Sequence, residues 1–188
     1  MVTDLRHFLD ITDDAPGPAR RLAEQLGHVV RAGTAGPAGT TWVSAIACTR
    51  RPQRRVCPGT ITVTRTDLPA AIEWACTSCG DDGVISGWEH SLFDLRAASR
   101  TAKPSRAVQV VVPVKSMAAL RSISLIDTET ERLIYTAHMT RNGAVLHGTE
   151  DDFDDLLGYI AAEANHTPNR THRQQLDQAY GHITRAQA

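Results

Sequence analysis

The sequence predicts an α+β protein in which a small β segment is flanked by an N-terminal helix and by a C-terminal mixed unit ending in two helices. Apolar residues recur at helical spacing near both ends of the chain, whereas polar and apolar residues alternate between residues 41 and 88. All four cysteines lie in that alternating stretch. We therefore expect an N-terminal helical lead over residues 1–40, a cysteine-bearing β module over 41–98 and an α+β unit over 99–188.

The composition restricts the class of protein. The 188 residues include 20 basic and 21 acidic ones, so the formal net charge of −1 argues against binding through bulk charge. Hydrophobic residues make up 41% of the chain and aromatic residues only 5%, so aliphatic side chains must fill the core. No apolar run is long enough for a membrane span, and no secretory signal pattern is present. We expect a cytoplasmic protein that does not bind membranes.

The N-terminal helix is predicted over residues 19–31, after the breaker at 16–18. Its buried face has apolar residues at i, i+4, i+7 and i+8, namely Leu22, Leu26, Val29 and Val30. The glycine-rich stretch 33–39 is predicted to end it. Because that stretch follows a helix and precedes a strand, we interpret it as a connector and not as a phosphate-binding loop.

Period-two alternation predicts the strands of the β module at residues 42–48, 60–64, 72–76 and 84–85. Ile61 and Val63 alternate with threonines, which is typical of a half-exposed strand. The three tryptophans, Trp42, Trp74 and Trp88, fall within or at the edge of this module. We expect them to form its core, with stacking on bases as the alternative.

The C-terminal unit follows a polar connector over residues 99–106. We expect a strand at 108–112, a short helix at 116–123, an ambiguous segment at 127–132, and a hairpin of 133–140 and 144–147 around Asn142 and Gly143. Thr149 and Asp152 have the spacing of a capping box and predict a helix over 149–164. A second helix is supported by Leu176, Tyr180 and Ile183.

The cysteines, Cys48, Cys57, Cys76 and Cys79, have the pattern C-x8-C, 18 residues, C-x2-C. Arginine greatly outnumbers lysine, which is typical of a high-GC bacterial genome, and a bacterial cytoplasm keeps thiols reduced. A metal site is therefore favoured over disulfides or free buried thiols. The first pair is expected on a strand–loop–strand unit and the second at a strand end and its turn, so the two pairs should converge as tetrahedral coordination requires.

The segment Cys76-Thr77-Ser78-Cys79-Gly80 resembles the knuckle of the zinc-ribbon fold class, over residues 41–88. The first pair departs from the usual C-x2-C because residues 49–56 are inserted between its cysteines. The resemblance implies one structural Zn²⁺ held by four thiolates, a set that leaves no open coordination position. Iron remains the alternative metal, because thiolates alone do not select between the two.

No catalytic motif is recognisable, which favours a non-enzymatic protein. The chain lacks His-Glu-x-x-His, the zinc-deaminase pair of motifs and Gly-x-Ser-x-Gly. His90 lies near the β module and is interpreted as solvated, with a ligand role as the alternative. The acidic residues at 150–155 are interpreted as a helix start and not as a cation site. His166, His172 and His182 lack the i, i+4 spacing of a metal pair.

Basic residues gather in the loop between the first two cysteines. The four arginines of this loop are Arg50, Arg51, Arg54 and Arg55, and no acidic residue lies between positions 41 and 66. A metal-anchored arginine loop suits phosphate oxygens, which suggests contact with nucleic acid. Two alternatives remain: a solvated basic hairpin, and a protein–protein adaptor whose zinc is purely structural and whose C-terminal helices contact the partner.

Overall fold

The computed structural model describes residues 1–12, 14–96 and 106–187. The chain divides into two units, Met1–Arg96 and Ala97–Ala188, each with its own set of internal contacts. The described residues contain both helices and strands in each unit, which confirms the predicted α+β class. All but the last residue of the expected connector at 99–106 lies outside the described residues.

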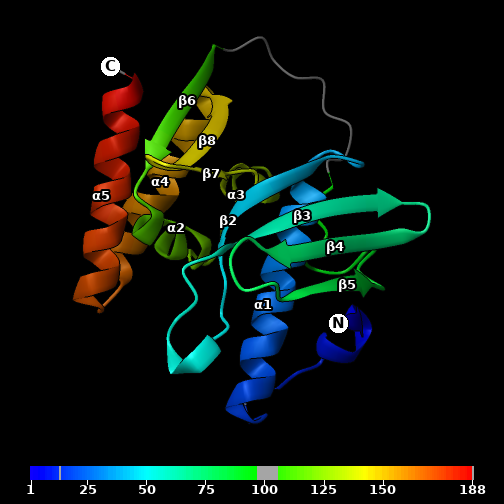
Figure 1. Cartoon of the computed structure of the whole chain (residues 1–188). Helices are drawn as coiled ribbons and strands as arrows, with labels where there is room; N and C mark the ends of the chain where they lie inside the picture. Colours follow the sequence, from blue (N-terminus) through cyan, green and yellow to red (C-terminus); the bar gives the residue numbers. More distant parts are fainter. Residues whose placement is uncertain (13, 97–105, 188) are drawn as a thin grey trace. The chain divides into compact units, whose positions relative to one another are not determined.

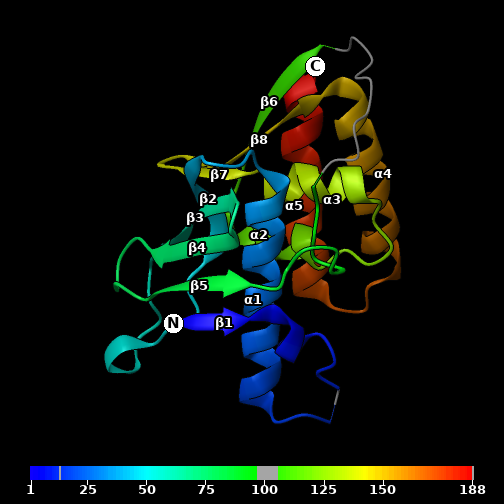
Figure 2. The same cartoon turned by 90° about the vertical axis from the view of Figure 1, so that its right-hand side faces the viewer.

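The first unit contains a five-stranded sheet with the order β1-β5-β4-β3-β2. Its strands are β1 (Val2–Asp4), β2 (Thr41–Ala47), β3 (Thr60–Asp67), β4 (Ala70–Cys76) and β5 (Asp82–Ser86). Neighbouring strands are antiparallel except for β1 and β5, which are parallel. One helix, α1 (Gly17–Ala35), runs across one face of this sheet (Figures 1 and 2).

Helix α1 continues one turn beyond the predicted end. We expected the glycine stretch at 33–39 to terminate the helix, but Gly33 lies inside it and is buried. A Cβ atom at Gly33 would lie 2.9 Å from Cγ2 of Ile72 on β4. The stretch does end the helix, at Ala35 with Gly36 as its C-cap, but Gly33 itself serves close packing of helix on sheet and does not break the helix.

The alternation in β3 separates the two faces of the sheet. Ile61 and Val63 point into the core and are at most 1% exposed, whereas the threonines of the strand lie on the other, partly exposed face. Trp88 is fully buried and Trp74 is 9% exposed, so both belong to the core, while Trp42 is half-buried. The expected core role of the tryptophans is confirmed for these two.

Arg65 is the one charged residue among the inward-facing side chains of β3. Its Nη1 donates to the carbonyl oxygens of Thr34 at 3.0 Å and Gly36 at 3.1 Å, and its Nε lies 3.0 Å from Oδ1 of Asp67. Helix α1 has no basic residue in its last turn. The sheet thus supplies the positive charge and the donors that the helix C-terminus needs.

The described residues of the second unit form three antiparallel strands, ordered β7-β8-β6, and four helices. Its elements are β6 (Ala107–Val112), α2 (Val114–Arg121), α3 (Thr128–Tyr135), β7 (His138–Thr140), β8 (Gly143–Thr149), α4 (Glu150–His166) and α5 (Arg170–Gln187). Helix α5 packs against β6, α2 and α4. The core includes Val110, Leu146, Phe153 and Leu176.

Two local predictions in the second unit were wrong. The strand predicted at 133–140 is reduced to β7, because Asp127 accepts hydrogen bonds from the amides of Glu129 and Thr130 and starts α3 in the preceding segment. Tyr180, expected on the buried face of the last helix, is 41% exposed. Its neighbour Ala179 is fully buried in its place.

Candidate metal centre

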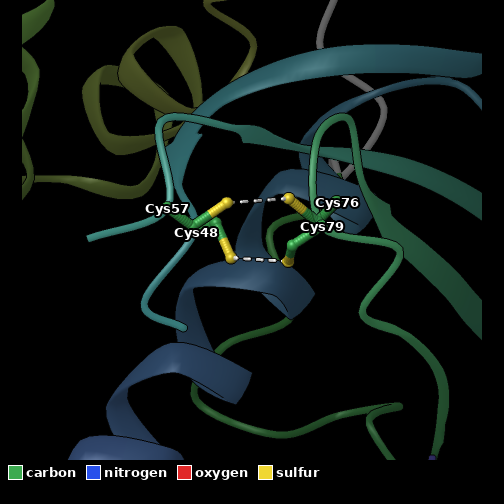
Figure 3. Close-up of side chains that lie close together, drawn as sticks. All are labelled: Cys48, Cys57, Cys76 and Cys79. Atoms are coloured by element: carbon green, nitrogen blue, oxygen red, sulfur yellow. Dashed lines mark hydrogen bonds between the residues drawn. The ribbon is translucent and has the colours of Figure 1, made fainter. Parts of the chain in front are cut away.

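The structure brings the four cysteines together at one end of the first unit's sheet. The four Sγ atoms all lie within 4.8 Å of one another. Figure 3 shows that the sulfurs of Cys48 and Cys57 face those of Cys76 and Cys79. This is the convergence that the strand assignment predicted.

Backbone hydrogen bonds place the first pair. Cys48 directly follows β2 and its amide donates to the carbonyl of Gly59 at 2.8 Å. The amide of Cys57 donates to the carbonyl of Arg50 at 3.0 Å. The eight-residue insert is thereby closed at its base, so that an opened C-x8-C spacing still presents two sulfurs side by side.

The second pair is placed by the turn between β4 and β5. Cys76 ends β4, and its amide donates to the carbonyl of Asp81 at 2.7 Å. Gly80 has a φ of 69°, a left-handed conformation that glycine adopts without steric cost. The turn therefore directs Cys79 back towards Cys76, as expected of a Cys-x-x-Cys-Gly knuckle.

Two of the six separations between sulfurs match tetrahedral coordination. The Sγ atoms of Cys48 and Cys79 are 3.8 Å apart, and those of Cys57 and Cys76 are 3.6 Å apart. A tetrahedral ion with metal–sulfur bonds of about 2.3 Å holds its sulfurs about 3.8 Å apart. All four cysteines are free, and neither separation approaches the ~2.05 Å of a disulfide bond.

Backbone amides stabilise negative charge on the sulfurs. The amide of Gly59 donates to the Cys57 sulfur and that of Ser78 to the Cys76 sulfur, both at 3.4 Å. Burial raises the pKa of Cys76, but the amides of Cys79 and Ser78 outweigh burial and bring it to about 7. At Cys48 burial dominates and raises the pKa to about 12. A cation would favour the thiolate form at all four positions.

The other candidate ligands of the sequence do not form such a group. Within the described ranges, the four cysteines are the only cluster of three or more metal-binding side chains. His90 is exposed and has a φ of 59°, and its amide donates to Oδ2 of Asp94 at 3.0 Å. Among the described residues, neither the acidic helix start nor the three C-terminal histidines belong to such a cluster; these histidines are His166, His172 and His182.

The arginine loop, residues 49–56, extends from the first cysteine pair. Nε of Arg50 lies 3.4 Å from Oδ2 of Asp81, so this ion pair joins the two cysteine-bearing segments. Arg51, Arg54 and Arg55 are exposed, and none pairs with a carboxylate of the described residues. A solvated basic hairpin was one alternative for this loop, and among the described residues the structure gives a carboxylate partner only to Arg50.

Two residues at the tip of the arginine loop have left-handed backbone conformations. Gln53 and Arg54 have φ values of 52° and 66°, and the Arg55 amide donates to the Pro52 carbonyl at 3.1 Å. Such angles are unfavourable for residues with a Cβ atom. The closed base of the loop and its tight turn hold the arginines outward despite this cost.

A comparison of the chain with protein-family models, curated proteins and solved structures found no match. The interpretation of the site therefore depends on its geometry. In the part of the chain that the structure describes, no helix has the length and apolar character needed to cross a membrane.

Proposed function

We propose that this protein is a non-enzymatic metal-binding protein whose four cysteines hold one Zn²⁺ in a structural site. The observation that carries the proposal is the convergence of four Sγ atoms within 4.8 Å. Four thiolates this close together, three of them buried, would be costly without a cation, because each charge loses solvent and repels the others. Four thiolates also complete a tetrahedron, so the ion has no position for substrate or water.

The structural role follows from what the site connects. It joins the β2–β3 segment to the β4–β5 turn, and the amide of Thr77 donates across this junction to the carbonyl of Thr60 at 2.9 Å. A structural zinc site can contribute on the order of 10 kcal/mol to folding. We therefore expect the ion to hold this end of the sheet and the base of the arginine loop.

Metal analysis of freshly prepared, reduced protein tests the site. We expect about one zinc per chain, and loss of the metal when Cys57 and Cys76 are both replaced by serine. The matched control is Ser78→Ala, an exposed neighbour, which leaves the four sulfurs in place. Reduced wild-type protein with no bound metal would overturn the proposal. A coloured protein that contains iron would show that the metal of the site is iron and not zinc.

We propose further that the arginine loop contacts phosphates of nucleic acid. Three exposed guanidinium groups, those of Arg51, Arg54 and Arg55, have no carboxylate partner among the described residues and support this interpretation. The loop itself has no aromatic side chain to stack on bases. Contacts of this kind position a nucleic acid without reading its sequence.

A salt titration of binding to generic DNA and RNA tests the loop. Replacing Arg54 and Arg55 by alanine should reduce the slope of log affinity against log salt by up to about 2, because up to two phosphate contacts are lost. The matched control replaces Arg20 and Arg21, two exposed arginines of α1, and should leave the slope unchanged. Equal slopes for both variants would refute nucleic-acid contact and favour the adaptor function.

A further inference from the structure

The four cysteines of the metal centre differ in exposure. Cys48 and Cys57 are each 4% exposed and Cys76 is 8% exposed, whereas Cys79 is the one that is only partly buried. A reagent from solution therefore meets Cys79 first. Oxidation of a thiolate depends on access as well as on its charge.

The site is tightly closed where Gly59 lies against it. A Cβ atom at Gly59 would fall 2.5 Å from the Sγ of Cys76 and 2.9 Å from Cβ of Ser78. The backbone at Gly59 thus lies directly against one sulfur. Cys57 and Cys76, although only 3.6 Å apart, are shielded there from solvent.

We propose that Cys79 is a site of oxidation by hydroperoxides, and that its oxidation leads to a disulfide with Cys48. The proposal builds on the proposed metal centre, because the same two sulfurs are its ligands. Cys48 is the partner because its Sγ lies 3.8 Å from that of Cys79. The Arg50–Asp81 ion pair joins the segments that carry these two cysteines.

The reaction balances with the hydroperoxide as the two-electron oxidant. The Cys79 thiolate attacks one peroxide oxygen, so an S–O bond forms and the O–O bond breaks. The alkoxide leaves and takes up a proton to become the alcohol. The Cys48 thiolate then attacks the sulfenic sulfur of Cys79, the S–S bond forms and hydroxide leaves as water. Two thiolates are oxidised and the peroxide is reduced to an alcohol and water, with two protons consumed.

The disulfide removes one sulfur from each cysteine pair. The two remaining sulfurs, those of Cys57 and Cys76, cannot complete a tetrahedral set. Oxidation at Cys79 is therefore expected to release the metal and to loosen the base of the arginine loop. Reduction by a dithiol would restore all four ligands.

Peptide mapping of the full chain after sub-stoichiometric tert-butyl hydroperoxide tests the inference. Trypsin separates the cysteines onto residues 32–50, 56–65 and 66–96, because arginine precedes each of these peptides. We expect the first cross-link to join 32–50 to 66–96, and fragmentation to assign it to Cys48 and Cys79. A first cross-link between Cys57 and Cys76, or between Cys76 and Cys79, would overturn the inference.

A chromogenic zinc chelator supplies the second readout. In wild-type protein, zinc release should rise in step with the Cys48–Cys79 cross-link. Cys79→Ser should slow peroxide consumption at least about tenfold relative to wild type, with Ser78→Ala, an exposed neighbour, as the matched control that retains all four sulfurs. Equal peroxide consumption by the two variants would contradict the role of Cys79.

The map also separates this inference from the proposed function. Protein that contains no metal but forms the Cys48–Cys79 cross-link first would refute the metal centre and support the oxidation site. Protein that contains one zinc but does not form the cross-link would support the metal centre and refute the oxidation site. The peptide map of the wild-type protein tests the oxidation site even if a serine variant fails to fold.

Discussion

Gly59 controls how closely the two cysteine pairs approach. No side chain fits between its backbone and the Cys76 sulfur, since a Cβ atom would lie 2.5 Å away from it. The amide of Gly59 also donates to the Cys57 sulfur at 3.4 Å. One residue therefore contacts a sulfur of each pair, and its lack of a side chain is part of the site.

We predict that Gly59→Ala weakens metal binding and lowers the free energy of unfolding of the first unit by about 1–3 kcal/mol, as expected for overpacking. The change should be read by zinc competition with a chelator and by chemical denaturation. Gly158→Ala is the matched control, because nothing lies within 4 Å of its Cβ position in α4. Its expected effect is a slight stabilisation. Unchanged zinc affinity in Gly59→Ala would contradict the close approach.

At this scale the sequence identified the four sulfurs but not the residues that position them. The Cys-Pro-Gly at positions 57–59 was a usable signal, because a glycine two residues after a cysteine permits an amide to reach the sulfur. Arg65 had no such signal. Its role depends on the carbonyls of Thr34 and Gly36, which are about 30 residues away along the chain.

At the scale of elements, helix α4 shows how a local signal fixes a boundary. The Thr149 hydroxyl accepts from the amide of Asp152 at 3.2 Å, and Oδ2 of Asp152 accepts from the amide of Thr149 at 2.8 Å. Both halves of the predicted capping box are therefore confirmed. The helix starts one residue after Thr149, since the cap itself lies outside the helix.

We predict that Thr149→Ala lowers the free energy of unfolding of the second unit by about 1 kcal/mol, because an amide of the first turn loses its acceptor. Urea denaturation followed by circular dichroism measures the change. Thr171→Ala in α5 is the control, since this exposed side chain caps nothing and its replacement should change stability by less than about 0.5 kcal/mol. A larger loss of unfolding free energy in Thr171→Ala than in Thr149→Ala would contradict the assignment of Thr149 as the helix cap.

In other elements, the structure that local composition favours differs from the one that capping and packing produce. Residues 133–135 have strand-like composition, yet they complete a helix because Asp127 caps it at its start. Gly33 lies inside α1, where Ile72 of β4 packs against it and leaves no room for a side chain. Ile72 is remote from Gly33 in the sequence and lies outside the local window in which periodicity is judged, whereas the Asp127 cap lies within that window but is not a periodic signal.

At the scale of the whole molecule, the chain divides into two units, and the cysteine cluster belongs entirely to Met1–Arg96. The ion is therefore expected to stabilise one unit selectively. Two of the hydrogen bonds at the site join Cys48 to Gly59 and Thr77 to Thr60. Their amides report directly on whether the metal-binding end of the sheet stays closed.

We predict that removing the metal with a chelator, under reducing conditions, lowers hydrogen-exchange protection at the Cys48 and Thr77 amides by at least about tenfold. Protection of β6 and β8 in the second unit should not change. Exchange measured by mass spectrometry on the full chain compares the two units in one sample. An equal loss of protection in both units would refute selective stabilisation by the metal.

The sequence by itself determined the α+β class, the helical and alternating segments, the capping box of α4 and the set of four cysteines. These depend on periodicity, on turn and cap chemistry and on residue type, all of which act within a few residues. Only the tertiary structure decided that the sulfurs face one another 3.6 and 3.8 Å apart, and that Cys79 is the more exposed. Those properties depend on how separate strands and turns pack, because distance and exposure are set by neighbours remote in sequence.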